Sequence, residues 1–215
     1  MLKKFLKNCK KPEGKFGEWV VKAMNKGHQP LSLWAFDVCP LSDGETVLDV
    51  GCGGGGNLLR ILERCPNSRV EGIDYSEESV ACSRKTTGAY ADRCGIVCGD
   101  AMQLPYPDET FDRAVSFESI YFWPDPLQGL KEMFRILKVG GKVMLASEMT
   151  DPFKGKFWAK RCEGMTIYTA EQLASFLSEA GFSEVKVHKT RKVWCAVEGA
   201  KCPGMQRGAI VVGNR

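Results

Sequence analysis

The sequence predicts an α/β fold in which a doubly wound, mostly parallel sheet carries helices on both faces. Apolar runs typical of buried strands alternate with helical patterns from residue 45 to residue 146. Five glycines, at positions 51 and 53–56, follow the first of these strands and open a helix. Parallel strands that alternate with helices connect through right-handed crossovers, so this order predicts one sheet with two covered faces.

Length and composition indicate a single globular domain. The chain has 215 residues, of which 44% are hydrophobic and 26% charged. Its apolar runs fall short of the roughly 18 residues that span a bilayer, and no apolar stretch follows the charged start to form a signal peptide. We therefore expect a cytoplasmic protein with no membrane partner.

The cysteine pattern and the net charge argue against a metal site and against a nucleic-acid partner. The ten cysteines form no C-x-x-C pair and only two histidines accompany them, so we expect reduced structural thiols and no metal. The net charge of +4 is mild and sits largely in lysines among residues 1–15. We interpret that segment as a solvated terminus, which makes a nucleic-acid partner an unfavoured alternative. The sequence carries no signal for an oligomeric state.

The segment before the first strand is predicted to form a helical cap. Residues 1–15 read as loosely ordered, and apolar residues then recur at helical spacing over 16–24 and again over 31–36. We expect residues 1–44 to lie over a cofactor cleft, with Trp19 and Trp34 packed inside, ahead of a domain at 45–215. Between the two helices, His28 either faces the substrate or cofactor or is a surface loop histidine.

The remaining elements follow from periodicity and capping residues. Strands are predicted at 47–50, 70–74, 95–99, 111–117 and 142–146, and helices at 57–64, after Ser76, at 127–137 and at 170–180. Ser76 and Thr169 are expected to cap helix starts, and Gly181 to end the last helix. Residues 147–169 show no pattern, 185–188 and 193–197 resemble an antiparallel hairpin, and 209–212 form an edge strand or a packed tail.

The glycine turn points to a nucleotide-like cofactor. Gly51, Gly53 and Gly56 satisfy G-x-G-x-x-G, and Asp74 ends the next strand, about 20 residues on, where an acid can accept hydrogen bonds from ribose hydroxyls. Dehydrogenases and methyltransferases that use S-adenosylmethionine (SAM) share this pattern. Asp49 would repel a pyrophosphate at this turn and suits a cationic ligand such as SAM. Alternatively, Asp49 caps backbone N–H groups.

Five motifs in order carry a family resemblance. They are VLDVGCGGG (47–55), GIDYS (72–76), GDAMQLPY (99–106), FDRAVSFESIYFWPD (111–125) and RILKVGGKVML (135–145). Together they resemble the class I SAM-dependent methyltransferases, in the subgroup that acts mostly on small molecules and has a methyltransferase type 11-like domain. The resemblance implies a Rossmann-like sheet of seven strands whose last strand runs antiparallel. It also implies SAM as the cofactor and S-adenosylhomocysteine as its product.

The resemblance further implies a role for each residue at its motif positions. Asp49, Gly51, Cys52 and Gly53 would line the methionine part of SAM, Asp74 would hold the ribose, Tyr75, Asp100, Ala101 and Met102 would surround the adenine, and Phe117 and Glu118 would close the pocket. Cys52 suits a small-residue slot better than the role of nucleophile.

The expected reaction is methyl transfer to an O, N, S or C atom of a small-molecule acceptor. The acceptor site should lie where strands end in loops. Candidate catalytic residues are Glu118 or His28 as base and Tyr121, which could orient the acceptor; Trp123 could line the substrate or simply pack. No [Asp/Asn]-Pro-Pro-aromatic motif follows the fourth strand, which disfavours base-amino methylation. The alternatives are an RNA or protein methyltransferase, an NAD-dependent oxidoreductase and a non-catalytic SAM-binding protein.

Overall fold

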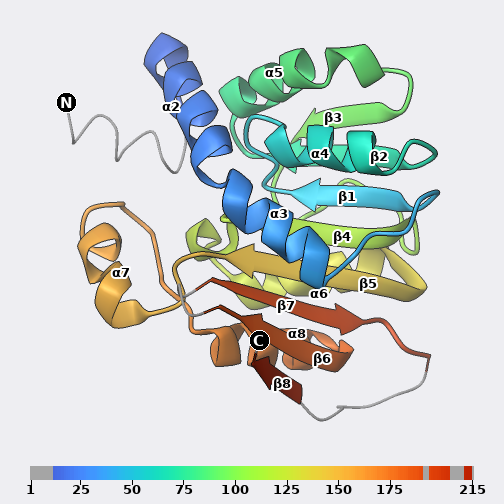
Figure 1. Ribbon diagram of the computed structural model, residues 1–215, viewed down its shortest axis with the longest axis vertical. Coiled ribbons are helices and arrows are strands. Elements are labelled where there is room, and N and C mark those ends of the chain that lie inside the picture. Colours follow the sequence, from blue (N-terminus) through green and yellow to red (C-terminus); the bar gives the residue numbers. More distant parts are fainter. Residues whose placement is uncertain (1–11, 191–193, 204–210, 215) are drawn as a thin grey trace.

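The computed structural model describes residues 12–190, 194–203 and 211–214, and its centre is one mixed sheet. The eight strands are ordered β3-β2-β1-β4-β5-β7-β6-β8 (Figure 1). Their bounds are β1 (Thr46–Val50), β2 (Arg69–Asp74), β3 (Cys94–Cys98), β4 (Phe111–Phe117), β5 (Leu137–Ser147), β6 (Ser183–Lys189), β7 (Cys195–Ala200) and β8 (Val211–Asn214).

Strand directions confirm the predicted seven-stranded arrangement and extend it by one strand. Neighbours from β3 to β5 pair in parallel, whereas β7 lies antiparallel to both β5 and β6. β8 adds to the edge of β6 in parallel, which confirms an edge strand at residues 211–212. Positions 193, 209 and 210, which we also expected in strands, lie outside the described residues.

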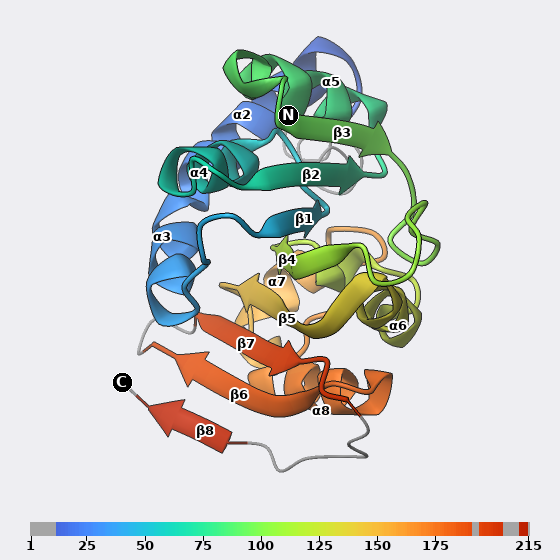
Figure 2. The same ribbon diagram turned by 90° about the vertical axis from the view of Figure 1, so that its right-hand side faces the viewer.

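Helices cover both faces of the sheet, as predicted (Figures 1 and 2). Their bounds are α2 (Gly14–Gly27), α3 (Gln29–Val38), α4 (Gly56–Arg64), α5 (Glu77–Thr86), α6 (Pro126–Ile136), α7 (Pro152–Ala159) and α8 (Ala170–Ala180), with short 3-10 helices η1 (Gly88–Tyr90) and η2 (Ile120–Phe122). None of these helices is long and apolar enough to cross a membrane. The described cysteines are free thiols.

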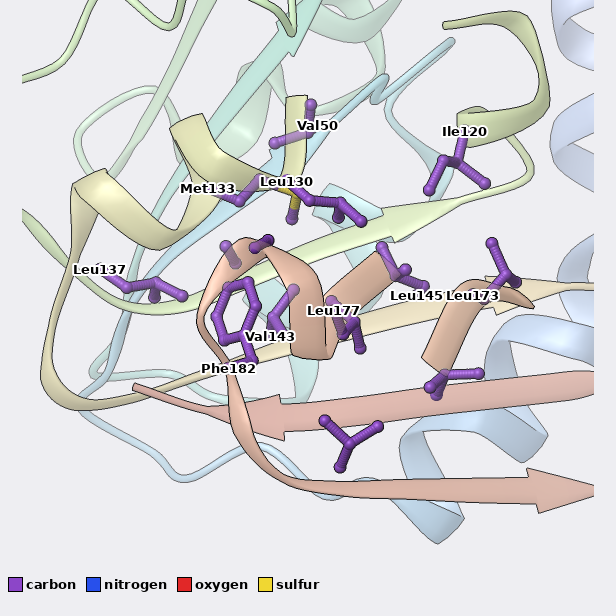
Figure 3. Packing of buried hydrophobic residues seen from close by; sticks show 14 of the residues in the cluster. Val50, Ile120, Leu130, Met133, Leu137, Val143, Leu145, Leu173, Leu177 and Phe182 are labelled. Atoms are coloured by element: carbon purple, nitrogen blue, oxygen red, sulfur yellow. The ribbon is translucent and has the colours of Figure 1, made fainter. Parts of the chain in front are cut away.

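Two apolar cores follow from the alternation of side chains along the strands. Leu48 packs into one core and Val47 into the other, since successive strand residues point to opposite faces. Figure 3 shows the first core, in which Leu177 of α8 lies beside Val143 of β5 and Leu130 of α6 lies beside Met133 of the same helix. The second core holds α3 and α4 against the opposite face.

The capping predictions are confirmed. The Ser76 hydroxyl accepts from the Ser79 N–H at the start of α5, and Thr169 forms a reciprocal capping box with Gln172 at the start of α8. Gly181 ends α8 with a φ of 110°, a left-handed conformation that favours glycine.

The two predicted cap helices are present, with differences in detail. α2 begins at Gly14, so the expectation of loose order is wrong for residues 14 and 15, and residues 1–11 lie outside the described chain. Trp19 is 58% exposed, and within the described residues its ring stacks on that of its helix neighbour Phe16, so its predicted packing role is wrong. Trp34 does pack, with its ring centroid 6.2 Å from that of Trp194.

Two boundaries also differ from the sequence prediction. α7 lies within the stretch at 147–169 where we expected no element, because its apolar residues do not gather on one side: Phe153 is 84% exposed, and Gly155 is its buried residue. Asp151 caps this helix by accepting from the N–H groups of Phe153 and Lys154. Leu137 is extended and begins β5 instead of ending α6, and residues 139–141 continue that strand through an irregular register.

Candidate functional site

Three adjoining pockets lie where the parallel strands end, at the side to which the arrows of β1 and β5 point in Figure 1. The first lies against the glycine turn under α2, the second against the ends of β2 and β3, and the third between the α2–α3 junction and the loop after β5. Gly51 and Asp74 line the first two, Met24 and His28 line the first and third, and Phe122 lines all three. The pockets therefore form one continuous site.

Neighbouring side chains pack so closely on the glycine turn that they leave no room for a Cβ atom at two of its positions. A Cβ at Gly51 would lie 2.3 Å from the Ser119 Oγ, and a Cβ at Gly54 would lie 2.3 Å from a methyl group of Val21 on α2. Gly51 also has a φ of 79°, which disfavours other residues. Glycine at these positions lets the helical cap and the loop after β4 close directly on the turn.

Asp74 connects the first two pockets, as expected of the acid that ends β2. Its Oδ2 accepts from the Gly53 N–H and its Oδ1 from the Ser76 N–H, each at 2.9 Å. Burial raises the pKa of Asp74 even though both backbone hydrogen bonds lower it. Each carboxylate oxygen has a second lone pair, so Asp74 can also accept hydrogen bonds from ligand hydroxyls.

Asp49 is a buried carboxylate without a compensating group. It is 1% exposed, and in the described chain neither oxygen has a hydrogen-bond partner, so the alternative that it caps backbone N–H groups is not supported. Burial, and then the charge of Asp74, raises its pKa to about 8. Strand alternation turns Asp49 toward the same face as Val47, and although Asp49 itself lines none of the three pockets, it lies two residues before Gly51, which lines the first two. An unpaired acid there fits a ligand that carries positive charge, such as SAM.

The other predicted cofactor residues line the first two pockets. Cys52, Gly53 and Phe117 line the first, and Tyr75, Asp100, Ala101 and Met102 line the second. Asp100 holds its own turn by accepting from the Met102 N–H at 2.9 Å. Burial raises the pKa of the Cys52 thiol well above its usual value, which agrees with a packing role and not with that of a nucleophile.

An imidazole and two carboxylates meet at the boundary of the first and third pockets. His28 Nδ1 lies 2.7 Å from Glu148 Oε1 and 3.7 Å from Glu118 Oε2. Glu118 accepts from the Tyr121 hydroxyl at 3.0 Å and from the Glu148 N–H at 2.6 Å. We call these three side chains the His28–Glu118–Glu148 cluster. The structure thus brings together the three predicted catalytic candidates, which are His28, Glu118 and Tyr121.

The electrostatics of the cluster favour a charged imidazole. Burial lowers the pKa of His28, but its contact with Glu148 and the charges of both glutamates outweigh burial and raise it. Burial raises the pKa of Glu118, and His28 opposes that shift. Glu118 also has a φ of 53°, a strained conformation of a kind that gathers at functional sites.

Among the residues that the structure describes, the same cluster is one of two groups that could hold a metal ion. Its three ligand atoms lie within 4.8 Å of one another, as do those of Cys39, His188 and Glu198. Both sets come from separate segments of the chain, so local spacing gave no metal pattern. The absence of a metal cofactor stays a prediction.

The structure adds detail at Trp123 and a new residue, Glu148, to the sequence expectations. Trp123 lines the second pocket and not the third, and it packs so closely on α6 that a Cβ at Gly129 would lie 2.6 Å from its ring. The packing alternative is therefore supported, and a role of Trp123 in lining the substrate stays a prediction. Glu148 was missed, although it directly follows β5, where the rule that ligands bind beyond strand ends could have found it.

Comparisons with known proteins agree with this geometry. A family model described as a methyltransferase domain matches residues 48–145. The chain is 32% identical to 2-methyl-6-phytyl-1,4-hydroquinone methyltransferase 1, chloroplastic, from Oryza sativa subsp. japonica, over 92% of this chain and 56% of that protein. It is also 32% identical to a demethylmenaquinone methyltransferase from Listeria monocytogenes, over 66% of this chain and 72% of that protein. The chain spans about half the length of the plant relatives, between 53% and 56% for three of them.

Solved structures share the fold. A SAM-dependent methyltransferase from Aquifex aeolicus matches with a TM-score of 0.73 at 21% identity, covering 87% of this chain and 100% of that one. Phosphoethanolamine N-methyltransferase 2 from Haemonchus contortus, in complex with SAM, matches with a TM-score of 0.69 at 17% identity, covering 81% of this chain and 53% of that one. At such identities the likeness shows the fold alone.

Proposed function

The chain belongs to the family of SAM-dependent methyltransferases, and we propose that it moves a methyl group from SAM to an O, N, S or C atom of a small molecule in the third pocket. One observation carries this proposal: the third pocket shares Met24, His28 and Phe122 with the pocket over the glycine turn. An acceptor there can approach a methyl group held in the first pocket.

Asp74 and Asp100 are proposed as cofactor residues from their positions in the first two pockets, and Asp49 from its buried, unpaired carboxylate just before the glycine turn. Asp49 would compensate the positive charge of the methionine part, Asp74 would accept from the ribose hydroxyls, and Asp100 would accept from the adenine amino group. When bound, the cofactor supplies an electrophilic methyl group on a positively charged sulfur. The protein's task is to hold the acceptor in line with that methyl group, at roughly 3–3.5 Å, and to exclude water.

The cluster at the pocket boundary is proposed to manage the acceptor's proton. Glu118 and His28 are the candidate bases, and Tyr121, which donates to Glu118, would keep that carboxylate oriented. Glu148 joins them because its carboxylate pairs with His28 at the same boundary.

The alternatives are less well supported. An NAD-dependent oxidoreductase would place a pyrophosphate near the unpaired carboxylate of Asp49. An RNA or protein methyltransferase would gain from cationic side chains at the acceptor mouth, and the described lining of the third pocket holds no Lys or Arg. We propose a cytoplasmic enzyme, although the names of the rice and Arabidopsis relatives mark those proteins as chloroplastic.

Calorimetric titration and product analysis test the proposal together. SAM and S-adenosylhomocysteine should bind the purified protein, and NAD should not. Incubation with SAM and a metabolite extract should yield S-adenosylhomocysteine and a compound heavier by one methyl group. Binding of NAD alone would reject the proposed function, and SAM binding without turnover of any acceptor would favour a non-catalytic binding protein.

A further inference from the structure

The walls of the third pocket are aromatic and thioether side chains. The pocket measures about 500 Å³, which suits a small organic molecule. Its apolar and aromatic lining residues are Ala23, Met24, Tyr121, Phe122, Met149, Trp158, Met165 and Trp194. Aromatic faces attract cations, most strongly alkylated ammonium groups, and methionine sulfur adapts to irregular shapes.

The polar end of the pocket carries an excess of negative charge. His28 and Glu148 line it, and Glu118, with a side chain only 4% exposed, lies behind them at 3.7 Å from the imidazole. Two carboxylates thus share one imidazole, so one negative charge stays uncompensated when all three groups are ionised. No Lys or Arg stands in the described lining to attract a carboxylate or phosphate.

We propose that the acceptor is an amine on a flat apolar group, with its nitrogen at the His28–Glu118–Glu148 cluster and its apolar part between Trp158 and Trp194. This inference rests on the proposed methyl transfer and names the class of acceptor. The uncompensated carboxylate attracts an ammonium group and repels anionic acceptors. The aromatic walls bind the flat group and also the methylated ammonium of the product.

The proton balance assigns the base role to Glu148. An imidazole that is held charged between two carboxylates is a poor proton acceptor, whereas the Glu148 side chain is 30% exposed and can exchange protons with solvent. The ammonium transfers one proton to the Glu148 carboxylate, so an N–H bond breaks and an O–H bond forms. The freed nitrogen lone pair then bonds to the methyl carbon while the carbon–sulfur bond breaks and its electron pair stays on sulfur. The products are a methylated ammonium, S-adenosylhomocysteine and one proton released to solvent.

Binding of matched probes tests the pocket without any need for turnover. The probes are 2-naphthyltrimethylammonium, 2-naphthol and 2-naphthoate, titrated into the full chain saturated with S-adenosylhomocysteine. We expect the ammonium to bind at least about tenfold more tightly than the naphthol and the naphthoate to bind most weakly, a difference of about 1.4 kcal/mol per tenfold step. Equal or tighter binding of the naphthoate would overturn the inference.

Variants locate the charge that selects the ammonium. Glu148→Gln should weaken binding of the ammonium about tenfold and leave that of the naphthol unchanged. Glu63→Gln, an exposed glutamate of α4 outside the three pockets, is the matched control and should change neither. Trp158→Leu should weaken binding of the ammonium probe more than binding of the naphthol. If Glu148→Gln and Trp158→Leu both bind the ammonium as the unmodified protein does, the assignment of the pocket is wrong.

Turnover separates this inference from the proposed function. S-adenosylhomocysteine formation is measured with 2-naphthylmethylamine and with 2-naphthalenemethanol as acceptors. Methylation of the amine supports the inference, and methylation of the alcohol alone overturns it while leaving the proposed function intact. A protein that binds no SAM would instead refute the proposed function, and the probe titrations, repeated without S-adenosylhomocysteine, would still decide whether the pocket selects an ammonium.

Discussion

Asp74 Oδ2 accepts a 2.9 Å hydrogen bond from the backbone N–H of Gly53, so the acid that ends β2 holds the glycine turn that follows β1. The other oxygen of Asp74 accepts from the Ser76 N–H, which fixes the carboxylate from its own side. One side chain therefore sets the shape of the first pocket and presents lone pairs to the second.

Replacement of Asp74 should affect both SAM binding and the turn. Asp74→Ala removes the acceptor for the ribose hydroxyls and for the Gly53 N–H, so SAM binding should weaken by about 1–3 kcal/mol and the melting temperature should fall. Asp74→Asn keeps one carbonyl acceptor, so its affinity for SAM should lie between those of the unmodified protein and Asp74→Ala. Calorimetric titration and thermal unfolding measure the effects. An unchanged dissociation constant in folded Asp74→Ala would remove this residue from the site.

The cluster beside the acceptor should control turnover more than cofactor binding. Glu118→Gln removes the buried charge but keeps an acceptor for the Glu148 N–H, and His28→Ala removes the cation between the carboxylates. Each variant should lose about 100-fold or more in turnover, the lower end of general acid–base effects, with little change in the SAM dissociation constant. Steady-state kinetics and titration separate the two quantities. Full turnover in both variants would remove Glu118 and His28 from proton transfer and leave Glu148 as the remaining acceptor in the cluster.

Asp49 should make stability and SAM binding depend on pH. Its pKa rises from 3.8 to about 8 on folding, so between these values the folded state holds more protons than the unfolded state. Stability without SAM should therefore fall as pH rises from about 4 to about 8.

Positive charge brought by SAM should lower the same pKa, so binding should release a proton below about pH 8. Titration in two buffers with different ionisation enthalpies, such as phosphate and Tris, measures that release. Asp49→Asn should abolish both the proton release and this part of the pH dependence. Release of equal size in the variant would assign the titration to another group.

Removal of metal ions should leave methyl transfer unchanged. His28 already lies between the carboxylates of Glu118 and Glu148 and compensates one of their two charges, and we expect no metal there, so dialysis against a chelator should not lower turnover. The assay compares chelated enzyme with enzyme supplied with Mg²⁺, Mn²⁺ or Zn²⁺. Loss of activity on chelation, restored by one of these ions, would place a cation among the three side chains.

Closure of α2 over the glycine turn should depend on Gly54. A Cβ there would lie 2.3 Å from a Val21 methyl group and 2.6 Å from the Asn25 amide nitrogen, so Gly54→Ala should push α2 outward and weaken SAM binding about tenfold. Gly88→Ala is the matched control, because its Cβ would meet nothing within 4 Å. Equal SAM affinities in Gly54→Ala and Gly88→Ala would show that the close packing of α2 on Gly54 is not needed for SAM binding.

The sequence predicted the sheet and the cofactor half of the site because both depend on local patterns. The bounds of β4 were predicted as residues 111–117, and the side chain of Asp74 lies at the glycine turn as its position at a strand end requires. α7 was missed because Phe153 and Phe157 are exposed and leave no apolar stripe to detect. Local capping by Asp151 was its clearest signal.

The acceptor half was only partly predictable because it is assembled from distant segments. His28 comes from the cap, Glu118 follows β4 and Glu148 follows β5, and their charges matter only once folding places them together. Sequence reasoning proposed the first two as separate candidates and did not find their partner. Sequence reasoning left Trp123 open between lining the substrate and packing; the structure shows its contact with α6, and its role toward the substrate stays a prediction.

The cap helix α3 packs against β5 and β7, and its Trp34 ring meets that of Trp194, so the chain's early residues rest on some of its last. During synthesis α3 leaves the ribosome long before these strands exist. We therefore expect nascent chains to remain unable to retain SAM until β7 has emerged. Arrested chains ending before residue 195 should be captured poorly on immobilised S-adenosylhomocysteine, and chains long enough to expose residue 200 should be captured well.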